Sequence, residues 1–320
     1  MNYIDVFNGD ADGICALVQL RRNQPQQSQL ITGIKRDINL LKYVQANADS
    51  IITVLDISFE KNMQDVQRLL QQGASIDYID HHKCGNLIQH EKLQTSIDLD
   101  ANTCTSLIVD KRLNGKYRAW AITAAFGDNL TDKAISLAKQ SNFTDSQIVM
   151  MKQLGILLNY NGYGGSIDDL FFDPAELFKK LQAFDTPFQF LEHDPETFKM
   201  LADGYKQDMA LAEQANVIHQ SQHTAIIELP DEVWARRVSG VFSNSLANQN
   251  PDRAHAVLTE KENGSYLVSV RAPLNRKFGA DELVSQFPTG GGRKAAAGIN
   301  QLPVERLEEF IIKMDNIFSI

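Results

Sequence analysis

The sequence predicts an α/β protein whose N-terminal part is a doubly wound parallel sheet, and three observations support this prediction. Apolar segments of strand length alternate with segments of helical periodicity from the first residues onward. Three of the predicted strands are followed directly by acidic residues. From residue 223 the apolar pattern changes to a period of two, which predicts a smaller C-terminal α+β domain with a mixed sheet.

The N-terminal elements follow one another through short connections. The predicted strands cover residues 3–7, 30–34, 51–55 and 75–79. The predicted helices between them cover residues 13–22, 38–46 and 59–70. Because short strand-helix-strand connections favour parallel pairing, we expect the C-terminal ends of these strands to meet at one edge of the sheet.

A helical extension follows this sheet. Its predicted helices cover residues 103–112, 119–128, 133–139 and 145–158. The glycine- and tyrosine-rich residues 159–165 predict a loop. Pro195 begins a stretch without a helix breaker, which predicts one long connector helix over residues 195–220. We therefore expect a first domain of residues 1–194, this connector, and a second domain of residues 221–320.

The second domain is expected to combine alternating strands with amphipathic helices. The predicted strands cover residues 225–229, 254–259 and 266–271. The predicted helices cover residues 238–247, 279–286 and 304–318. Residues 288–298, which are rich in glycine and alanine, predict a loop that leads into a further helix.

Composition restricts the class of partner. The chain has 320 residues and a formal net charge of −9, which argues against sequence-independent duplex binding and favours a small substrate or a short single strand. No apolar run approaches the roughly 18 residues of a membrane helix, and the start lacks a basic signal region, so we expect a cytoplasmic protein without a membrane partner. The three widely spaced cysteines fit neither a disulfide framework nor a zinc site. The sequence leaves open whether the chain forms a homodimer.

Acidic and imidazole side chains at the predicted strand ends form a candidate metal site. Its metal-binding candidates are Asp10, Asp12, Asp56, His81 and Asp128. Asp80-His81-His82 follows the fourth strand, and a carboxylate beside two imidazoles is costly to bury unless the groups bind metal or handle protons. Oxygen ligands with one nitrogen suit Mn²⁺ or Mg²⁺, and two such ions about 3.5–4 Å apart can activate water for attack on a phosphoryl group.

Helix capping offers an alternative explanation for the same acids. Asp10 and Asp12 could cap the helix that begins near Gly13, and Asp56 could cap the helix that follows it, as aspartates after strands commonly do. Capping explains any one of these residues as well as metal binding does. The arrival of four acids and two histidines at one edge favours the metal site.

Several of these motifs occur together in one known family. Asp80-His81-His82, with Asp10-Ala11-Asp12-Gly13 before it and Leu55-Asp56 between, resembles the DHH phosphoesterases. In the second domain, Val268-Ser269-Val270-Arg271, Gly279-Ala280-Asp281 and the glycine-rich residues 290–298 resemble the DHH-associated domain. The family includes single-strand exonucleases, oligoribonucleases, phosphatases of bisphosphorylated nucleotides, cyclic dinucleotide phosphodiesterases, and hydrolases of pyrophosphate or polyphosphate. The resemblance implies a metal-dependent phosphoesterase that cuts a nucleotide or short oligonucleotide phosphate ester in a cleft between its two domains.

The resemblance also implies roles for individual residues. Asp10, Asp12, Asp56, His81 and Asp128 would bind two Mn²⁺ or Mg²⁺ ions, with Asp56 bridging them. His82 would act on the leaving group as an acid or electrostatic partner, and Asp80 would orient its neighbours. The implied substrate-binding residues are Arg271, Gly290, Gly291, Gly292, Arg293 and Lys294. The alternatives are a tight turn that begins a helix for the glycines, and a solvent-facing charge on an edge strand for Arg271.

Three departures from the family pattern affect this interpretation. Asn8 stands where many relatives have a histidine or aspartate that binds the first metal, and its neutral oxygen would weaken that site. Arg293-Lys294 replaces a frequent His-Pro, which adds positive charge for a phosphate. Tyr163 stands where some relatives have arginine, and it could stack on a base or simply pack. The remaining alternatives are a pyrophosphate or polyphosphate hydrolase, and a catalytically impaired nucleotide or oligonucleotide binder, for which Asn8 is the best indication.

Overall fold

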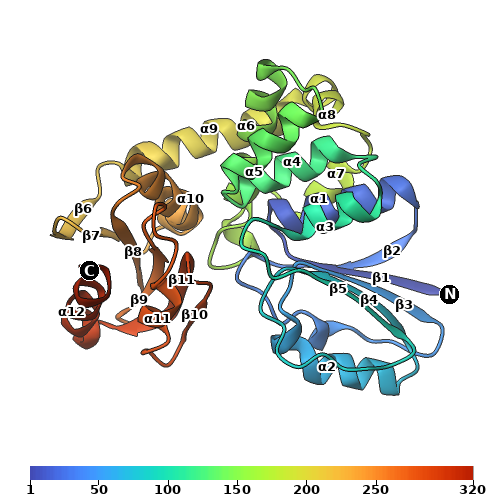
Figure 1. The fold of residues 1–320 in the computed structure, drawn as a ribbon, viewed down its shortest axis with the longest axis horizontal. Coiled ribbons are helices and arrows are strands. Elements are labelled where there is room, and N and C mark those ends of the chain that lie inside the picture. The colour runs from blue at the N-terminus through green and yellow to red at the C-terminus, as the bar shows by residue number, and fades with distance from the viewer. Residues whose placement is uncertain (320) are drawn as a thin grey trace. The chain divides into compact units, whose positions relative to one another are not determined.

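The computed structural model describes residues 1–319 and forms two compact units, of which the first ends at Ala202 and the second begins at Asp203 (Figure 1). The division falls inside helix α9 (Pro195–Ala212). Among the described residues, none of the helices combines the length and the apolar character that crossing a bilayer requires.

The first unit is built on a parallel sheet, as predicted. Its strands, β1 to β5, are Asn2–Phe7, Ser28–Ile31, Ser50–Leu55, Ser75–Asp80 and Leu93–Ile97. They pair in the order β2-β1-β3-β4-β5, and every pairing is parallel. The chain runs outward in opposite directions from β1 and β3, so these strands flank the topological switch point where open α/β sheets bind ligands. Strand β5 is an edge strand of mostly polar residues, and the sequence pattern did not predict it.

Helices cover both faces of this sheet, which makes the sheet doubly wound (Figure 1). Successive strand residues point to opposite faces. Thus Leu55 packs in the core beside α1 (Ala11–Asn23) and α3 (Thr105–Arg112). Its neighbour Val54 packs in the core beside α2 (Phe59–Gln71). The sheet is therefore buried on both sides, and its chemistry is left to the strand ends.

The helical extension packs on the α1 side of the sheet. Its helices, α4 to α8, are in order Arg118–Gly127, Thr131–Gln140, Asp145–Asn161, Pro174–Leu181 and Pro187–His193. A capping box of Thr144 and Gln147 begins α6. Helices α4 and α6 approach closely because Gly155 has no side chain: a Cβ there would lie 2.0 Å from the carbonyl oxygen of Thr123. This contact holds the C-terminal end of α4 against the first unit's core.

Two sequence-based predictions in the first unit are wrong. Residues 38–46 form only a short 3-10 turn, η1 (Leu41–Tyr43), instead of a helix. The Asn62 side chain satisfies the backbone there, because its oxygen accepts from the Leu41 N–H (3.2 Å) and its nitrogen donates to the Ile38 carbonyl (2.6 Å). The loop expected at residues 159–165 begins later, since α6 continues to Asn161 with Tyr160 fully buried.

The connector helix expected over residues 195–220 is also wrong beyond its first part. Helix α9 ends at Ala212, and Asn216–Gln220 forms strand β6. Strand β6 pairs with β7 (Thr224–Leu229) in antiparallel orientation. Pairing with a neighbouring strand therefore overrides the helical pattern of this segment, which contains no helix breaker.

The second unit is a mixed sheet with helices on both faces, and this confirms the predicted class. Its further strands, β8 to β11, are Ala254–Lys261, Ser265–Arg271, Gly290–Gly292 and Ala296–Pro303. The order is β10-β11-β9-β8-β7-β6, with β7 and β8 parallel and the other pairs antiparallel.

The helices of the second unit divide between the two faces of its sheet. Helix α10 (Val233–Gln249) connects the parallel strands β7 and β8 and packs against β8 and β9. Helices α11 (Ala280–Val284) and α12 (Leu307–Phe318) share a core with Ala256 and Leu258 of β8. The alternate β8 residues Val257 and Thr259 point to the opposite face and are also buried.

The glycine-rich residues 288–298 do not lead into a helix, as had been expected. They form the hairpin of β10 and β11, in which Gly291 lies opposite Gly298. Strand β11 also pairs with β9, so its alanines lie in the interior of the sheet. The backbone N–H and C=O groups of this segment are satisfied by long-range pairing, which the local alanine content does not indicate.

Gly290 offers a test of this hairpin. A Cβ added at Gly290 would lie 1.8 Å from the carbonyl oxygen of Val284, whereas one added at Gly291 would meet no heavy atom within 4 Å. We expect Gly290→Ala to lower the free energy of unfolding by about 1–3 kcal/mol, as overpacking does. The control Gly291→Ala should stay within about 0.5 kcal/mol of wild type. Urea denaturation measures both, and equal effects would contradict the packing of β10 on α11.

Candidate metal centre

The predicted site residues of the first unit meet at the C-terminal edge of its sheet. Asn8 and Asp10 follow β1, Asp56 follows β3, and His81 follows β4. Asp128 reaches them as the residue that ends helix α4. This edge includes the switch point between β1 and β3, where a parallel sheet leaves room for a ligand.

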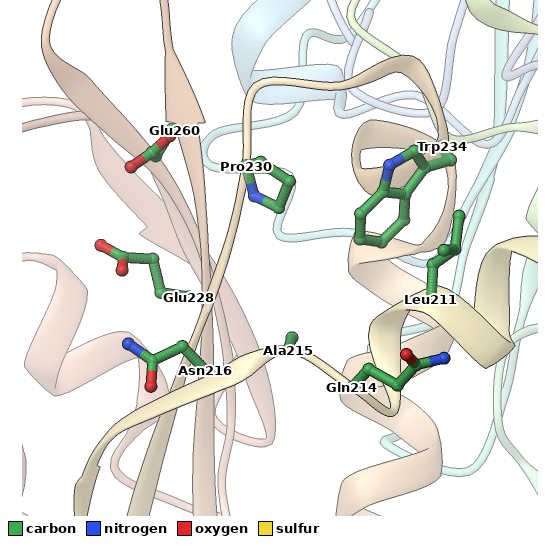
Figure 2. A pocket seen from close by; sticks show the side chains of 8 residues that line it. All are labelled: Leu211, Gln214, Ala215, Asn216, Glu228, Pro230, Trp234 and Glu260. Atoms are coloured by element: carbon green, nitrogen blue, oxygen red, sulfur yellow. The ribbon is translucent and has the colours of Figure 1, made fainter.

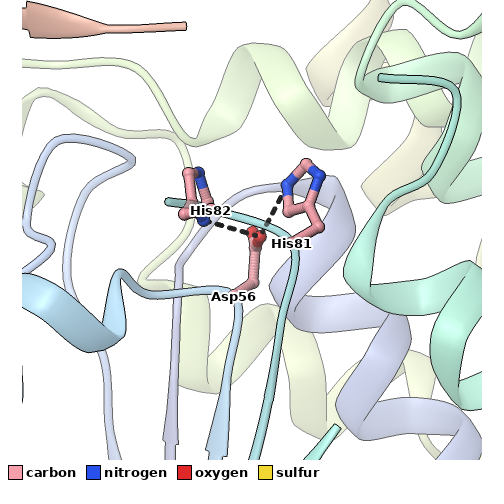
Figure 3. Close-up of side chains that lie close together, drawn as sticks. All are labelled: Asp56, His81 and His82. Carbon is pink, nitrogen blue, oxygen red and sulfur yellow. Dashed lines mark ion pairs between the residues drawn. The ribbon is translucent and has the colours of Figure 1, made fainter. Parts of the chain in front are cut away.

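Asp56 turns its carboxylate between the two histidines (Figure 3). Its Oδ1 lies 3.3 Å from His81 Nε2 and 3.8 Å from His82 Nδ1. The same oxygen accepts a hydrogen bond from the Thr105 hydroxyl (3.1 Å). Asp56 has a φ of 59°, a left-handed conformation that aspartate tolerates better than most residues. Helix α2 is capped by Ser58, so Asp56 does not act as its cap and the capping alternative is wrong for this residue.

His81 is oriented by the main chain. Its Nδ1 lies 3.0 Å from the carbonyl oxygen of Thr103, and because a carbonyl only accepts, Nδ1 carries the proton. In the neutral ring the lone pair is then on Nε2, which lies 3.7 Å from Asp12 Oδ2 and 3.7 Å from Asp128 Oδ2. A cation between such a lone pair and the carboxylates would stabilise this arrangement. A main-chain acceptor on the outer nitrogen is also how proteins usually hold a metal-binding histidine.

Asp12 joins the start of α1 to the start of α3. Its two oxygens accept hydrogen bonds from the N–H groups of Thr105 and Ser106, each at 2.7 Å. Both donors lie in the first turn of α3, so Asp12 contributes to the N-terminal end of that helix and does not cap α1. The main-chain donors fix the direction of the carboxylate toward His81.

The electrostatics of this cluster indicate a shortage of positive charge. Burial, together with Asp128 and Asp10, raises the pKa of Asp12 to about 6. Burial and the neighbouring acids raise the pKa of Asp56 well above its usual range. A divalent cation would relieve both effects. Two groups of side chains bring ligand atoms within 4.8 Å of one another: Asp56, His81 and His82, and Asp12, His81 and Asp128. Carboxylate oxygens with one or two imidazole nitrogens fit Mn²⁺ or Mg²⁺.

Asp10 is placed differently from the other acids. It is the N-cap of α1, and its Oδ1 accepts from the N–H groups of Asp12 (2.9 Å) and Gly13 (3.1 Å). Capping therefore accounts for one of its oxygens. The other oxygen pairs with the ammonium group of Lys35. Burial is the largest single influence and would raise the pKa of Asp10, but the charge and hydrogen bond of Lys35, together with the N–H of Gly13, bring the pKa below its usual value.

Lys35 is a residue of the centre that sequence reasoning missed. Its Nζ also lies 2.9 Å from Asn159 Oδ1 and 3.4 Å from Asp128 Oδ1. Burial is the largest single influence and would lower the pKa of Lys35, but Asp10, Tyr163 and Asp128 together outweigh it, and the pKa is raised well above its usual value. Lys35 follows β2, so it lies at the same edge as the other strand ends. Its position after a predicted strand was the only hint in the sequence that Lys35 belongs to the centre. A single lysine forms no recognisable motif, so this hint was not sufficient.

Asn8 uses both ends of its amide in local contacts. Its Oδ1 accepts from the N–H of Asp10 (3.2 Å), and its Nδ2 donates to the carbonyl of Lys35 (3.0 Å). These two contacts also settle which end of the amide is oxygen. The oxygen that was expected to serve as a weak ligand is engaged with the main chain. The weakness expected of a metal site beside Asn8 stays a prediction.

Asp80 and His82 form a second oriented pair. His82 Nδ1 lies 2.7 Å from Asp80 Oδ1, and Asp80 is fully buried. The His82 side chain is 28% exposed, and its ring meets that of His81 edge to face at 4.5 Å between centroids. Because the carboxylate only accepts, the His82 proton at Nδ1 points to Asp80, and Nε2 is the nitrogen left for other partners.

The predicted substrate residues lie in the second unit. Arg271 is on β9, an interior strand, so the edge-strand alternative is wrong. Its guanidinium donates to Asn244 Oδ1 (2.6 Å) and to the carbonyls of Val270 (3.0 Å) and Gly240 (3.4 Å). Arg293 and Lys294 are exposed beyond β10, where Gly292 has a φ of 147°. A φ in this region favours glycine.

A separate pocket in the second unit involves none of the predicted site residues. Leu211 and Trp234 line one side, and Glu228 and Glu260 line the other (Figure 2). Two carboxylates beside a pocket oppose the binding of a phosphate. We therefore do not assign the substrate to this pocket.

Comparison with known proteins agrees with this geometry. Residues 218–319 match the family model of the DHHA1 domain. No curated protein matches the chain by sequence. Three solved structures that align with nearly the whole chain complement these findings.

The first of these structures is exonuclease RecJ bound to manganese, with a TM-score of 0.61 and 14% identity over 98% of this chain and 89% of that chain. The pGpG-specific phosphodiesterase PggH from Vibrio cholerae has a TM-score of 0.56 and 15% identity over 99% of this chain and 100% of that chain. An exopolyphosphatase-related protein from Bacteroides fragilis has a TM-score of 0.51 and 13% identity over 99% of this chain and 91% of that chain.

The chain therefore shares its fold with exonuclease RecJ and with the pGpG-specific phosphodiesterase, and its C-terminal part matches the DHHA1 domain, as the resemblance in the sequence implied. At these identities the likeness to the solved structures is one of fold. The roles of the individual site residues rest on the contacts described above.

Metal binding should stabilise the first unit. Because Mn²⁺ would relieve the repulsion among the buried acids, we expect it to raise the free energy of unfolding by about 2.7 kcal/mol at 100 times its Kd. Asp56→Asn should lose most of this gain, while the metal-free variant stays folded because asparagine also tolerates a left-handed backbone. Thermal denaturation with and without Mn²⁺ measures the difference, and Asp132→Asn on an exposed helix is the control. An unchanged Mn²⁺ effect in Asp56→Asn would contradict its role as a ligand.

Proposed function

We propose that this protein is a metal-dependent phosphoesterase that hydrolyses a phosphate ester of a nucleotide or short oligonucleotide. The observation that carries the proposal is the buried set of Asp12, Asp56 and Asp128 around the Nε2 of His81. The fold shared with exonuclease RecJ and with a pGpG-specific phosphodiesterase supports a nucleotide substrate.

A Mn²⁺ or Mg²⁺ ion held by Asp12, Asp56, His81 and Asp128 would lower the pKa of a water molecule and neutralise charge on the phosphoryl group. The chain prepares these ligands in advance. Thr103 holds the ring of His81 through its carbonyl, and the first turn of α3 holds the carboxylate of Asp12. Ligands that need little rearrangement make the site ready to bind its ion and substrate.

His82 is the group we propose for proton transfer to the leaving oxygen. Asp80 holds its Nδ1, which keeps the ring in one orientation. Nε2 can then donate a proton as the ester bond breaks. His82 suits this role better than His81, whose Nδ1 is bound by Thr103 and whose Nε2 faces the acids.

The second domain is proposed to bind the substrate's phosphate and nucleoside. Arg293 and Lys294 supply exposed positive charge, and the glycine backbone from 290 to 292 allows a ligand to approach closely. Arg271 is proposed to contribute its guanidinium charge to phosphate binding. We expect both domains to contact the substrate and to close on it through a hinge.

Chelation and a substrate panel test the reaction. We expect EDTA to abolish hydrolysis and added Mn²⁺ to restore it, with a linear dinucleotide such as pGpG or a short single strand as the preferred substrate. Release of phosphate or nucleotide is measured for each substrate in the panel. If phosphate were released faster from pyrophosphate or polyphosphate than from the nucleotides, the substrate would be a phosphoanhydride instead of a nucleotide ester. Hydrolysis that survives chelation would overturn the metal-dependent mechanism.

The same panel separates an enzyme from an impaired binder. Calorimetric binding of a nucleotide without turnover would support the binder, for which Asn8 was the best indication. If Asn8→His bound metal fully and still failed to hydrolyse the nucleotide, the protein would be a binder and the proposed enzymatic function would be wrong.

Variants in the second domain test the proposed phosphate contacts. We expect Arg293→Ala and Lys294→Ala to raise KM about 10-fold with little change in kcat, because each removes a charge that binds substrate and transition state equally. Lys277→Ala, an exposed lysine of the same domain outside the glycine loop, should leave both constants unchanged. Steady-state kinetics at several salt concentrations provide the measurement. If Arg293→Ala and Lys294→Ala also keep the wild-type KM, the glycine loop does not belong to the substrate site.

A further inference from the structure

Lys35 places a fixed positive charge inside the candidate metal centre. Its ammonium group contacts three side-chain oxygens: one of the Asp10 carboxylate, Asn159 Oδ1 at 2.9 Å and Asp128 Oδ1 at 3.4 Å. An ammonium has three N–H donors, so these three acceptors match its full capacity. The ring of Tyr163 lies below it, 5.6 Å from Nζ to centroid. The protein thus surrounds this cation with a set of oxygens similar to a metal site.

The main chain holds Lys35 in this position from both sides. Its N–H donates to the carbonyl of Gly162 (2.7 Å), and its carbonyl accepts from the Asn8 amide (3.0 Å). Gly162 is itself close to Asp10, since a Cβ there would lie 3.0 Å from the Asp10 Cα. Asn8 therefore has a structural role at this site, because its amide anchors Lys35, the residue that supplies the positive charge.

Lys35 divides the acids into two sets. Asp10 serves the N-terminus of α1 and Lys35, and it belongs to neither group of residues whose ligand atoms lie within 4.8 Å of one another. Asp12 and Asp56 turn toward His81. Asp128 lies between the sets, with Oδ1 toward Lys35 and Oδ2 toward His81. A cation already occupies the Asp10 side, and the His81 side retains a complete set of ligands.

We propose that this protein binds one divalent cation, on the His81 side of the centre, and that the ammonium of Lys35 takes the place of a second cation on the Asp10 side. The inference rests on the proposed metal-dependent function. An ion bound by Asp10 and Asp128 would have to share both oxygens with Nζ, and two cations in contact with the same oxygens repel each other. Lys35 offsets part of the negative charge of Asp10 and Asp128 but has no open position for water. Activation of water thus belongs to the His81 side alone.

Counting Mn²⁺ ions tests the inference. We expect one tightly bound ion per chain in the wild-type protein, by elemental analysis after gel filtration and by calorimetry. Lys35→Met removes the charge while keeping the length of the side chain, so it should raise the count to two. The two neighbouring ions should then give the spin-coupled electron paramagnetic resonance signal of a Mn²⁺ pair. Lys35→Arg and the exposed control Lys42→Met should remain at one ion.

The outcomes separate this inference from the proposed function. Two ions in the wild-type protein would overturn the inference and leave a metal-dependent phosphoesterase in place. No bound ion in the wild-type protein would overturn the proposed function itself. One ion in both the wild type and a folded Lys35→Met would show that Lys35 does not exclude the second ion, which also overturns the inference.

A crystal structure of the Mn²⁺-loaded wild type keeps the inference testable even if Lys35→Met fails to fold. One anomalous peak beside His81, with Nζ still on Asp10, is the expected result. A second peak on Asp10, with Lys35 displaced, would overturn it.

Discussion

The compensation of buried negative charge is the constraint on which this centre depends. Four carboxylates, those of Asp10, Asp12, Asp56 and Asp128, are held at one sheet edge with little access to water. Their mutual repulsion would favour unfolding unless each found a positive partner or a proton. The surrounding elements supply those partners in different ways.

The partners of the four carboxylates are main-chain N–H groups, an ammonium group and neighbouring side chains. The N-terminal turns of α1 and α3 provide main-chain N–H groups to Asp10 and Asp12. Lys35, from the loop after β2, provides an ammonium to Asp10 and Asp128. Asp56 has only a hydroxyl and the two histidines, and the pKa of its carboxyl is raised by burial and the neighbouring acids. The charge left over is concentrated where His81 points, which is where a divalent ion would do most to stabilise the fold.

The similar solved structures include an exonuclease, a pGpG-specific phosphodiesterase and an exopolyphosphatase-related protein, and these names point to different phosphate-containing substrates. A fold shared at 13–15% identity does not select among such substrates. Selection must come from side chains. In this chain Asn8 and Arg293-Lys294 are departures from the family pattern, and Asn8 contacts the main chain of Lys35.

The sequence alone determined the class of fold and most of the centre. Strands and helices of the parallel sheet follow from local periodicity, and acids at the ends of consecutive parallel strands must converge, so Asp12, Asp56 and His81 could be predicted together. Where local pattern and long-range pairing disagreed, the pattern failed. The alanines of β11 suggested a helix but were drawn into the sheet by β9 and β10.

Only the tertiary structure decided the positions of Lys35 and Asn8. Lys35 lies 93 residues before Asp128 and 124 before Asn159 in the chain, and no local rule joins such distant groups. From the sequence, the amide oxygen of Asn8 could bind either a metal or the main chain. In the structure it accepts from the N–H of Asp10, and the amide nitrogen donates to the carbonyl of Lys35. Sequence therefore identified the groups that carry charge, whereas the packing of separate segments determined which of those charges neutralise one another.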